Sequence, residues 1–367
     1  GTTDHHYRNG QESAGWRPVF GVVCWGFLGF SLKELLGETE EVPDPEEQQD
    51  SELVRMIKKG VLAFHLNEYD KSESLLHLSL RVAQDLMDEK AVTFIFDVLA
   101  NLAYQRGQHE KAEQLFKSVL KRHVEDGGDL YGNVFVAVSL KLAHCYEARQ
   151  DMENAIMGYH YCIAAQNEKI AALKEAKEDL DEDTLVLWAM SMEQYARLLK
   201  GIGRYSLARE HMQEALQVCR QLKGDLNLQT AVLRNDIGSI YTMERNYQDA
   251  ELEIEQAIDI VQKMIAGIEA ENTKKGEEDE EEAAPLKVGA FPNVHYEDMW
   301  SNLATYHINL GSVQLLGDKP HSAKYSCQEG SRLARIAGDE DSKEEATRCL
   351  KAVTDALKEA AKKRNEK

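Results

Sequence analysis

Short amphipathic segments recur along the chain, and the stretch from Phe96 to Leu120 shows how each is built. Its first apolar positions follow the spacing of one helix face, and they are Phe96, Leu99, Ala100 and Ala103. Gly107, which tolerates a positive φ, ends that helix. A second apolar face of the same period follows and consists of Ala112, Leu115, Phe116, Val119 and Leu120. The pattern predicts two helices joined by a tight turn, with alanines where the two backbones cross closely.

The same arrangement, in which two small residues stand twelve positions apart, recurs through the chain. The clearest copies pair Ala100 with Ala112, Ala143 with Ala155, Ala196 with Ala208, and Gly238 with Ala250. A weaker first copy has Gly60 and Ser72, and a degenerate last copy has Gly311 and Ala323. One copy would also suit an unrelated helical bundle, but four good copies in register indicate a tandem repeat.

The frame of small residues resembles the tetratricopeptide repeat, a pair of helices with a period of about 34 residues. The second small residues of successive copies are 40, 43, 53, 42 and 73 positions apart, so longer helices or connections must take up the difference. The resemblance implies an all-α, right-handed superhelical solenoid of about five to six helical hairpins with a concave face. We expect repeats over 51–266, a degenerate repeat over 294–340 and a C-terminal capping helix over 341–367.

An uncharged segment lies near the start of the chain, between Pro18 and Leu32. As a helix it would span about 22 Å, and extension through Leu36 brings it close to the thickness of a bilayer core. We expect a short transmembrane anchor at 18–36 after a disordered segment at 1–17; a cleaved targeting segment and an ordinary helix are the alternatives. An acidic linker is expected at 37–50, and a disordered acidic linker at 267–293.

Composition narrows the classes of function. The 367 residues carry a net charge of −21, which argues against nucleic acid as a partner because phosphate binding requires basic surfaces. The six cysteines lack the close spacing of a zinc site. Cys145 and Cys162 fall on consecutive expected helices, so they either form a disulfide or remain buried free thiols. The sequence contains no metalloprotease, P-loop or serine-hydrolase motif, so we expect no catalysis, no metal and no cofactor.

In tetratricopeptide repeats, polar positions of each first helix line the ligand groove. The resemblance therefore gives six candidate partner-binding residues, namely Asn101, Tyr104, Lys141, His144, Arg197 and Asn235. Their cationic and amide groups suit acidic side chains and a peptide backbone. Asp97 and Glu193 occupy two places of the clamp that binds the Glu-Glu-Val-Asp terminus of chaperones, so that ligand is not expected.

A closer resemblance covers residues 52–262. The stretches LANLAYQRGQHEKAEQLFK, from Leu99, and VSLKLAHCYEARQDMENAIMGYHYCI, from Val138, are similar to the family of mitochondrial tetratricopeptide repeat protein 19. That family implies a non-catalytic protein of the inner mitochondrial membrane, with its repeats expected on the intermembrane-space side. Its implied partner is respiratory complex III (cytochrome bc1), whose assembly and maintenance it supports, including clearance of fragments from processing of the Rieske iron–sulfur subunit. The alternative is a cytosolic cargo adaptor similar to kinesin light chains.

Overall fold

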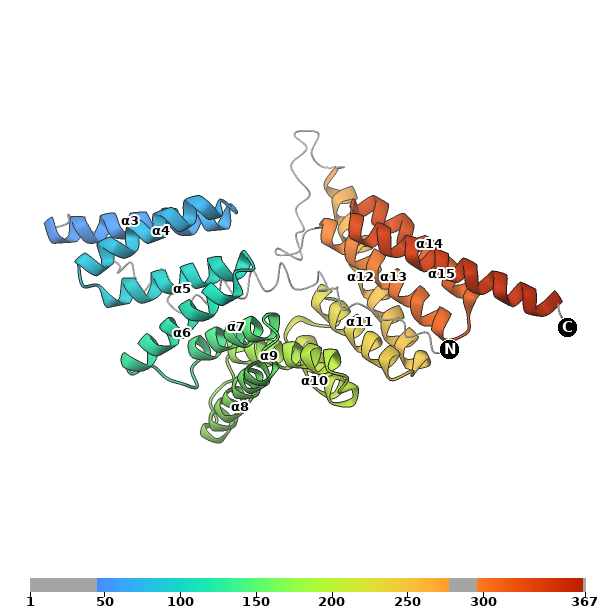
Figure 1. The fold of residues 1–367 in the computed structure, drawn as a ribbon, viewed down its shortest axis with the longest axis horizontal. Helices are drawn as coiled ribbons and strands as arrows, with labels where there is room; N and C mark the ends of the chain where they lie inside the picture. Colours follow the sequence, from blue (N-terminus) through green and yellow to red (C-terminus); the bar gives the residue numbers. More distant parts are fainter. Residues whose placement is uncertain (1–44, 277–295, 366–367) are drawn as a thin grey trace. The chain divides into compact units, whose positions relative to one another are not determined.

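The computed structural model describes residues 45–276 and 296–365, and all regular structure in these residues is helical (Figure 1). Thirteen helices in this part of the chain form six consecutive pairs and one final helix. The pairs are α3 (Pro45–His65) and α4 (Tyr69–Asp85); α5 (Glu89–Gln105) and α6 (His109–Glu125); α7 (Asn133–Ala148) and α8 (Met152–Ala176); α9 (Glu182–Gly201) and α10 (Tyr205–Lys223); α11 (Leu228–Met243) and α12 (Tyr247–Gly276); α13 (Tyr296–Leu316) and α14 (Pro320–Ala337), after which α15 (Glu340–Asn365) follows. The expectation of an all-helical repeat is confirmed for the described residues.

The described chain divides into two compact units, 45–195 and 196–365, and the division falls inside α9. In the first unit, Ile57, Phe94 and Leu99 belong to a core cluster built by α3, α4 and α5. In the second unit, Ile254 and Leu303 belong to a core cluster that joins α11, α12, α13 and α14. Each unit thus buries apolar faces between successive helices, as stacked repeats do.

Small residues sit where the helices of a pair approach most closely. Ala100 on α5 and Ala112 on α6 are both fully buried. At Gly238 on α11, a methyl group would lie 2.6 Å from Cγ1 of Ile254 on α12, which is closer than side-chain atoms pack. The recurring small residues therefore reflect helix packing, as the sequence pattern predicts.

The turn inside each pair contains one residue in the left-handed backbone region, two positions after the first helix ends. These residues are Asn67, Gly107, Gln150, Gly203, Arg245 and Asp318, with φ between 58° and 81°. In each turn, the main-chain amides of this residue and of the next one donate to carbonyl oxygens of the first helix. In one of them, Gly107 N donates to Tyr104 O at 3.0 Å and Gln108 N to Ala103 O at 2.9 Å. Hydrogen bonding thus holds four non-glycine residues in a backbone region that disfavours side chains.

Two expected linkers are partly helical. The helix α3 begins at Pro45, inside the range 37–50, and α12 continues to Gly276, inside the range 267–293. The buried side chains of Met264, Ile265 and Ile268 carry the apolar face of α12 beyond the expected end of the repeat region. The expected anchor at 18–36 and the segment 1–17 lie outside the described residues. Among the described helices, none is both long and apolar enough to cross a membrane.

The structure decides between the two alternatives for Cys145 and Cys162, a disulfide or two buried free thiols. Cys145 and Cys162 do not form a disulfide; both are buried free thiols, and the Cys162 thiol lies 3.6 Å from the carbonyl oxygen of Val136. The structure instead joins Cys327 on α14 to Cys349 on α15. Sequence spacing did not single out this pair because its members are 22 residues apart and meet only when α15 packs on α14.

Candidate partner-binding site

The candidate residues of the first unit pair with one another. On α7, Lys141 donates from Nζ to Oδ1 of Asn101 on α5 at 2.6 Å. Asn101 in turn donates to the main-chain oxygen of Asp97 at 2.7 Å and to its carboxylate at 3.1 Å. The side chain of Lys141 is only 1% exposed, and its Nζ lies 5.8 Å from the centre of the Phe116 ring. An ammonium group in this position is satisfied inside the protein and is not available to a ligand.

The charge of Lys141 is balanced by the buried carboxylate of Asp97. Burial raises the pKa of Asp97, whereas the positive charge of Lys141 and the hydrogen bond from Asn101 lower it. One carboxylate oxygen of Asp97 has no hydrogen-bond partner. The three side chains therefore form a buried polar group whose parts depend on one another.

Tyr104 on α5 and His144 on α7 form a second contact between these two helices. The Tyr104 hydroxyl and Nδ1 of His144 are 3.0 Å apart, and their ring centres are 5.3 Å apart. The ring of His109, the first residue of α6, lies 6.2 Å from each of them. Tyr104 and His144 are both half-buried, so they remain partly accessible to a ligand.

The second unit places its candidate residues in the same kind of contact. Arg197 on α9 donates to Oδ2 of Asp236 on α11 at 2.7 Å. The buried side chain of Asn235, also on α11, accepts a hydrogen bond from Asn309 on α13 at 2.9 Å. The hydroxyl of Tyr306 lies in this polar environment without a hydrogen-bond partner; its burial and the Asp236 carboxylate raise its pKa well above the ordinary value.

A regular offset links these contacts. Asn101 and Lys141, like Tyr104 and His144, are 40 residues apart, and Arg197 and Asp236 are 39 apart, as are Lys200 and Ser239, which are 3.4 Å from each other. Such offsets place the partners on the first helices of neighbouring repeats. We call this set of contacts the polar ladder. Each of the six predicted residues contacts a first helix one repeat away, so the candidates are brought together within each unit.

The sequence analysis missed a second set of contacts between neighbouring repeats. Each joins the residue directly after the second small residue of one repeat to the turn of the next repeat, and we call the set the turn ladder. Its pairs are Glu73 and Arg106 at 3.0 Å, Arg209 and Glu244 at 3.0 Å, Glu251 and Lys319 at 2.8 Å, and Glu113 with Arg149. The signal was present in the sequence as a charged residue at one fixed repeat position. Its polarity is reversed in the pair formed by Arg209 and Glu244.

The part of the chain that the structure describes has no group of three or more His, Cys, Asp or Glu side chains arranged to hold a metal ion. The polar ladder instead offers partly exposed tyrosine, histidine, arginine and lysine side chains above a buried polar layer. Groups of this kind hydrogen-bond to peptides and acidic side chains.

Comparison with known proteins identifies the family. A family model described as "Tetratricopeptide repeat" matches residues 187–263, and another with the same description matches residues 95–125. Tetratricopeptide repeat protein 19, mitochondrial, from Rattus norvegicus is 31% identical over 251 residues, which is 67% of this chain and 67% of that protein. The chain belongs to the family of mitochondrial tetratricopeptide repeat protein 19. The protein of the same name from Homo sapiens is 30% identical over 255 residues, again 67% of each chain. This member of the family is accordingly a mitochondrial tetratricopeptide-repeat protein.

A solved structure supports the fold of this tetratricopeptide repeat protein 19 relative. The crystal structure of BtubC (BKLC) from P. vanneervenii superposes with a TM-score of 0.52 at 20% identity, covering 81% of this chain and 94% of that chain. At this identity the likeness concerns the fold alone. Proteins of this fold are generally scaffolds that act through their surfaces.

Proposed function

We propose that the protein is a non-catalytic scaffold of the inner mitochondrial membrane that supports assembly and maintenance of respiratory complex III. In this role it binds complex III subunits and promotes clearance of the fragments left by processing of the Rieske iron–sulfur subunit. The observation that carries the proposal is membership of the tetratricopeptide repeat protein 19 family, at 31% identity over two-thirds of the chain.

The burial of the residues in the polar ladder suggests two different roles for them. Asn101, Lys141 and Asn235 are buried, so we assign them to holding neighbouring first helices in register. Tyr104, His144 and Arg197 are partly exposed, so we assign the contact with complex III to them and to the neighbouring Lys200. Within each unit, partly exposed polar groups that are already positioned by their buried neighbours bind at a lower entropic cost.

The proposed attachment to the membrane depends on the apolar segment at 18–36. This segment lies outside the described residues, and its length and the tryptophans Trp16 and Trp25 are the support for an anchor. The expected orientation puts the repeats in the intermembrane space.

A cytosolic cargo adaptor similar to kinesin light chains is the second candidate function. Its support is the shape of the repeats alone, because tetratricopeptide repeats serve many unrelated partners. The two functions predict different places in the cell. Full-length tagged protein should fractionate with mitochondria and resist carbonate extraction under the first, and should form a diffuse cytosolic pool under the second.

Capture of complex III from detergent-solubilised mitochondria tests the scaffold. The wild-type protein, tagged at its C-terminus, should retain complex III subunits. The Lys200→Glu variant should retain at least several-fold less, because it reverses a charge on the accessible part of the polar ladder. The matched control is Lys121→Glu, whose side chain on α6 is 77% exposed and pairs only with Glu125 of the same helix in a weak surface ion pair. Absence of complex III subunits from the wild-type capture would refute the proposed function.

A further inference from the structure

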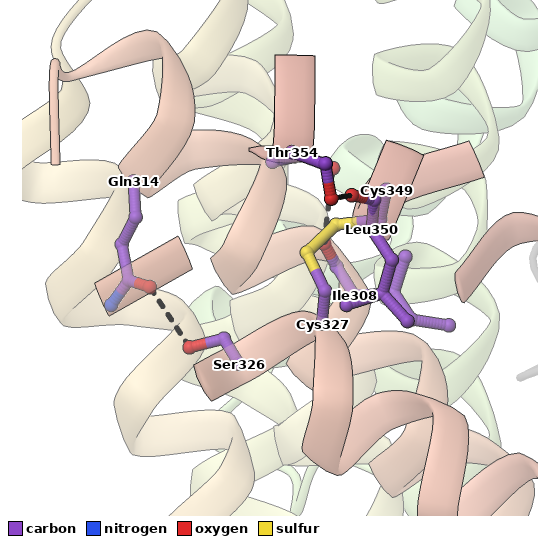
Figure 2. The surroundings of a disulfide bond; sticks show 8 residues. Ile308, Gln314, Ser326, Cys327, Cys349, Leu350 and Thr354 are labelled. Carbon is purple, nitrogen blue, oxygen red and sulfur yellow. Dashed lines mark hydrogen bonds between the residues drawn. A yellow bond between two sulfur atoms is a disulfide. The ribbon is translucent and has the colours of Figure 1, made fainter. Parts of the chain in front are cut away.

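A disulfide joins the last two helices of the second unit. Cys327 on α14 and Cys349 on α15 have Cα atoms 5.9 Å apart, and both side chains are buried (Figure 2). No helix follows α15 in the described residues, so this helix packs through one face only, against α13 and α14. That face is narrow, since its buried side chains are those of Ala346, Cys349 and Val353 with Ser342 at its start. Leu350 and Leu357 add partly buried contacts, and the covalent bond gives this helix a second attachment beside its apolar face.

Residues of α13 contact both sulfur atoms of the disulfide. At Gly311 on α13, a methyl group would lie 2.6 Å from Sγ of Cys327, so the glycine creates the space that this sulfur occupies. Sγ of Cys349 lies 3.9 Å from the carbonyl oxygen of Ile308. A disulfide sulfur has no hydrogen to donate, but the thiol of reduced Cys349 has this oxygen as a ready acceptor.

The other cysteines of the described residues differ from this pair. Cys145, Cys162 and Cys219 are buried and form no disulfide. Burial raises the pKa of the Cys145 thiol to about 12 and raises that of Cys162 as well. Thiol–disulfide exchange requires a thiolate, so these two thiols are poor reactants. Cys327 and Cys349 differ in lying close enough to be joined, with their Cα atoms 5.9 Å apart.

We propose that Cys327 and Cys349 form a redox-modified site, oxidised by a thiol–disulfide oxidoreductase in the oxidising space outside the mitochondrial matrix, where the bond fastens α15 to α14. Disulfides persist in oxidising compartments and are reduced in others. The proposal uses the mitochondrial family membership and is independent of any role in complex III. It assigns the second unit to the intermembrane-space side of the membrane.

The oxidation proceeds by two exchanges. The thiolate of Cys349, the more exposed of the two, attacks one sulfur of the disulfide in the oxidoreductase and forms a mixed disulfide, which releases one enzyme thiolate. The thiolate of Cys327 then attacks Sγ of Cys349 and displaces the second enzyme thiolate. The protein loses two electrons and two protons, and the oxidoreductase takes up both as its dithiol.

Thiol counting in intact mitochondria tests the site. Mitochondria containing the full-length protein are quenched in acid, denatured, and treated with a maleimide of high mass before and after reduction with dithiothreitol. We expect two fewer reactive thiols before reduction than after it. In Cys349→Ala this difference should vanish, whereas in the matched control Cys219→Ala it should persist. An equal thiol count before and after reduction would overturn the proposal, as would protection of two thiols that survives in Cys349→Ala.

Proteolysis of the purified full-length protein, compared before and after reduction of the wild type, tests the fastening itself. Dithiothreitol should increase cleavage of wild-type α15 by about tenfold or more, because the reduced helix opens locally. The double variant Cys327→Ala/Cys349→Ala should be cleaved at the reduced rate with or without dithiothreitol. A wild-type rate that reduction leaves unchanged would refute the fastening. A protein that is fastened in this way but captures no complex III would refute only the proposed function.

Discussion

At the scale of the residue, burial decides what a charged side chain does. Lys141 suits a ligand clamp when only its position in the repeat is considered. In the structure its ammonium group donates to Asn101 and compensates the buried carboxylate of Asp97. A buried charge pair of this kind adds little net stability, but losing one partner is costly because the other charge is then uncompensated.

Replacement of Lys141 should therefore destabilise the first unit. We expect Lys141→Met to lower the free energy of unfolding by about 3–5 kcal/mol, measured by urea denaturation at neutral pH. Adding Asp97→Asn should recover most of the loss, since it removes the uncompensated charge. The control Lys117→Met, on the half-exposed side of α6, should change stability by less than about 1 kcal/mol. A Lys141→Met protein as stable as the wild type would show that the pair is not coupled.

His307 on α13 is a buried residue whose ionisation opposes folding in acid. Neither ring nitrogen has a hydrogen-bond partner, and burial lowers its pKa from the ordinary 6.5, although Glu329 opposes this shift and Arg332 adds to it. As pH falls below 6.5, His307 binds a proton in the unfolded chain but not in the folded protein. The second unit therefore loses stability until the pH reaches the lower pKa of the folded state.

Thermal melts between pH 7.5 and pH 5 would measure this loss. His307→Leu should flatten the dependence of the melting temperature on pH below about 6.5, the ordinary pKa of histidine. The matched control His321→Leu, at the exposed start of α14, should retain the wild-type slope. Parallel slopes for His307→Leu and the wild type would contradict the assignment.

At the scale of the element, the helix pairs are set by close crossings and by strained turns. Ala112 is fully buried against α5, so a larger side chain has no space there. We expect Ala112→Leu to lower the free energy of unfolding by about 1–3 kcal/mol through overpacking. Urea denaturation measures the effect, with Ala171→Leu on the exposed end of α8 as the control. Equal midpoints for Ala112→Leu and the wild type would argue against a tight crossing.

The turn between α11 and α12 offers a change in the opposite direction. Arg245 has φ of 61°, a backbone conformation that disfavours side chains. We expect Arg245→Gly to raise the free energy of unfolding by about 0.5–1 kcal/mol, the strain removed less the added flexibility of the unfolded chain. Gly203→Ala, at the equivalent place in the preceding pair with φ of 81°, should lower it by a similar amount. A loss of stability in Arg245→Gly would indicate that the arginine side chain outweighs the strain.

Sequence reasoning predicted the helix pairs because their signal is local. The small residues recur at a fixed spacing, and each marks a crossing within one pair. The turns were harder to predict. Glycine at positions 107 and 203 indicates a left-handed backbone conformation, whereas Gln150 and Arg245 adopt this conformation without such a signal in the sequence. The sequence placed the candidate residues on first helices, but it could not give their pairing, because each partner is about 40 residues away or more.

At the scale of the whole molecule, the two units differ in what stabilises them. In the described part of the first unit, Cys145 and Cys162 are both free thiols and no disulfide is present, whereas the second unit contains the bond between Cys327 and Cys349. Closing a loop of 22 residues restricts the unfolded chain by about 3 kcal/mol. Reduction should therefore lower the hydrogen-exchange protection of α14 and α15 by about this free energy and leave α5 unchanged. Uniform loss of protection along the chain would contradict a local role for the bond.

The reversed polarity of Arg209 and Glu244 bears on how the repeats find their neighbours during synthesis. Similar hairpins on one chain readily dock in the wrong order, a frequent source of misassembly. If the hairpin that carries Glu244 docked on α6, its carboxylate would meet that of Glu113, and the two would repel each other. Arg209 attracts the same carboxylate. The reversed polarity of this one pair thus disfavours docking of the hairpin on the wrong neighbour. It favours stacking of the hairpins in the order in which they are synthesised.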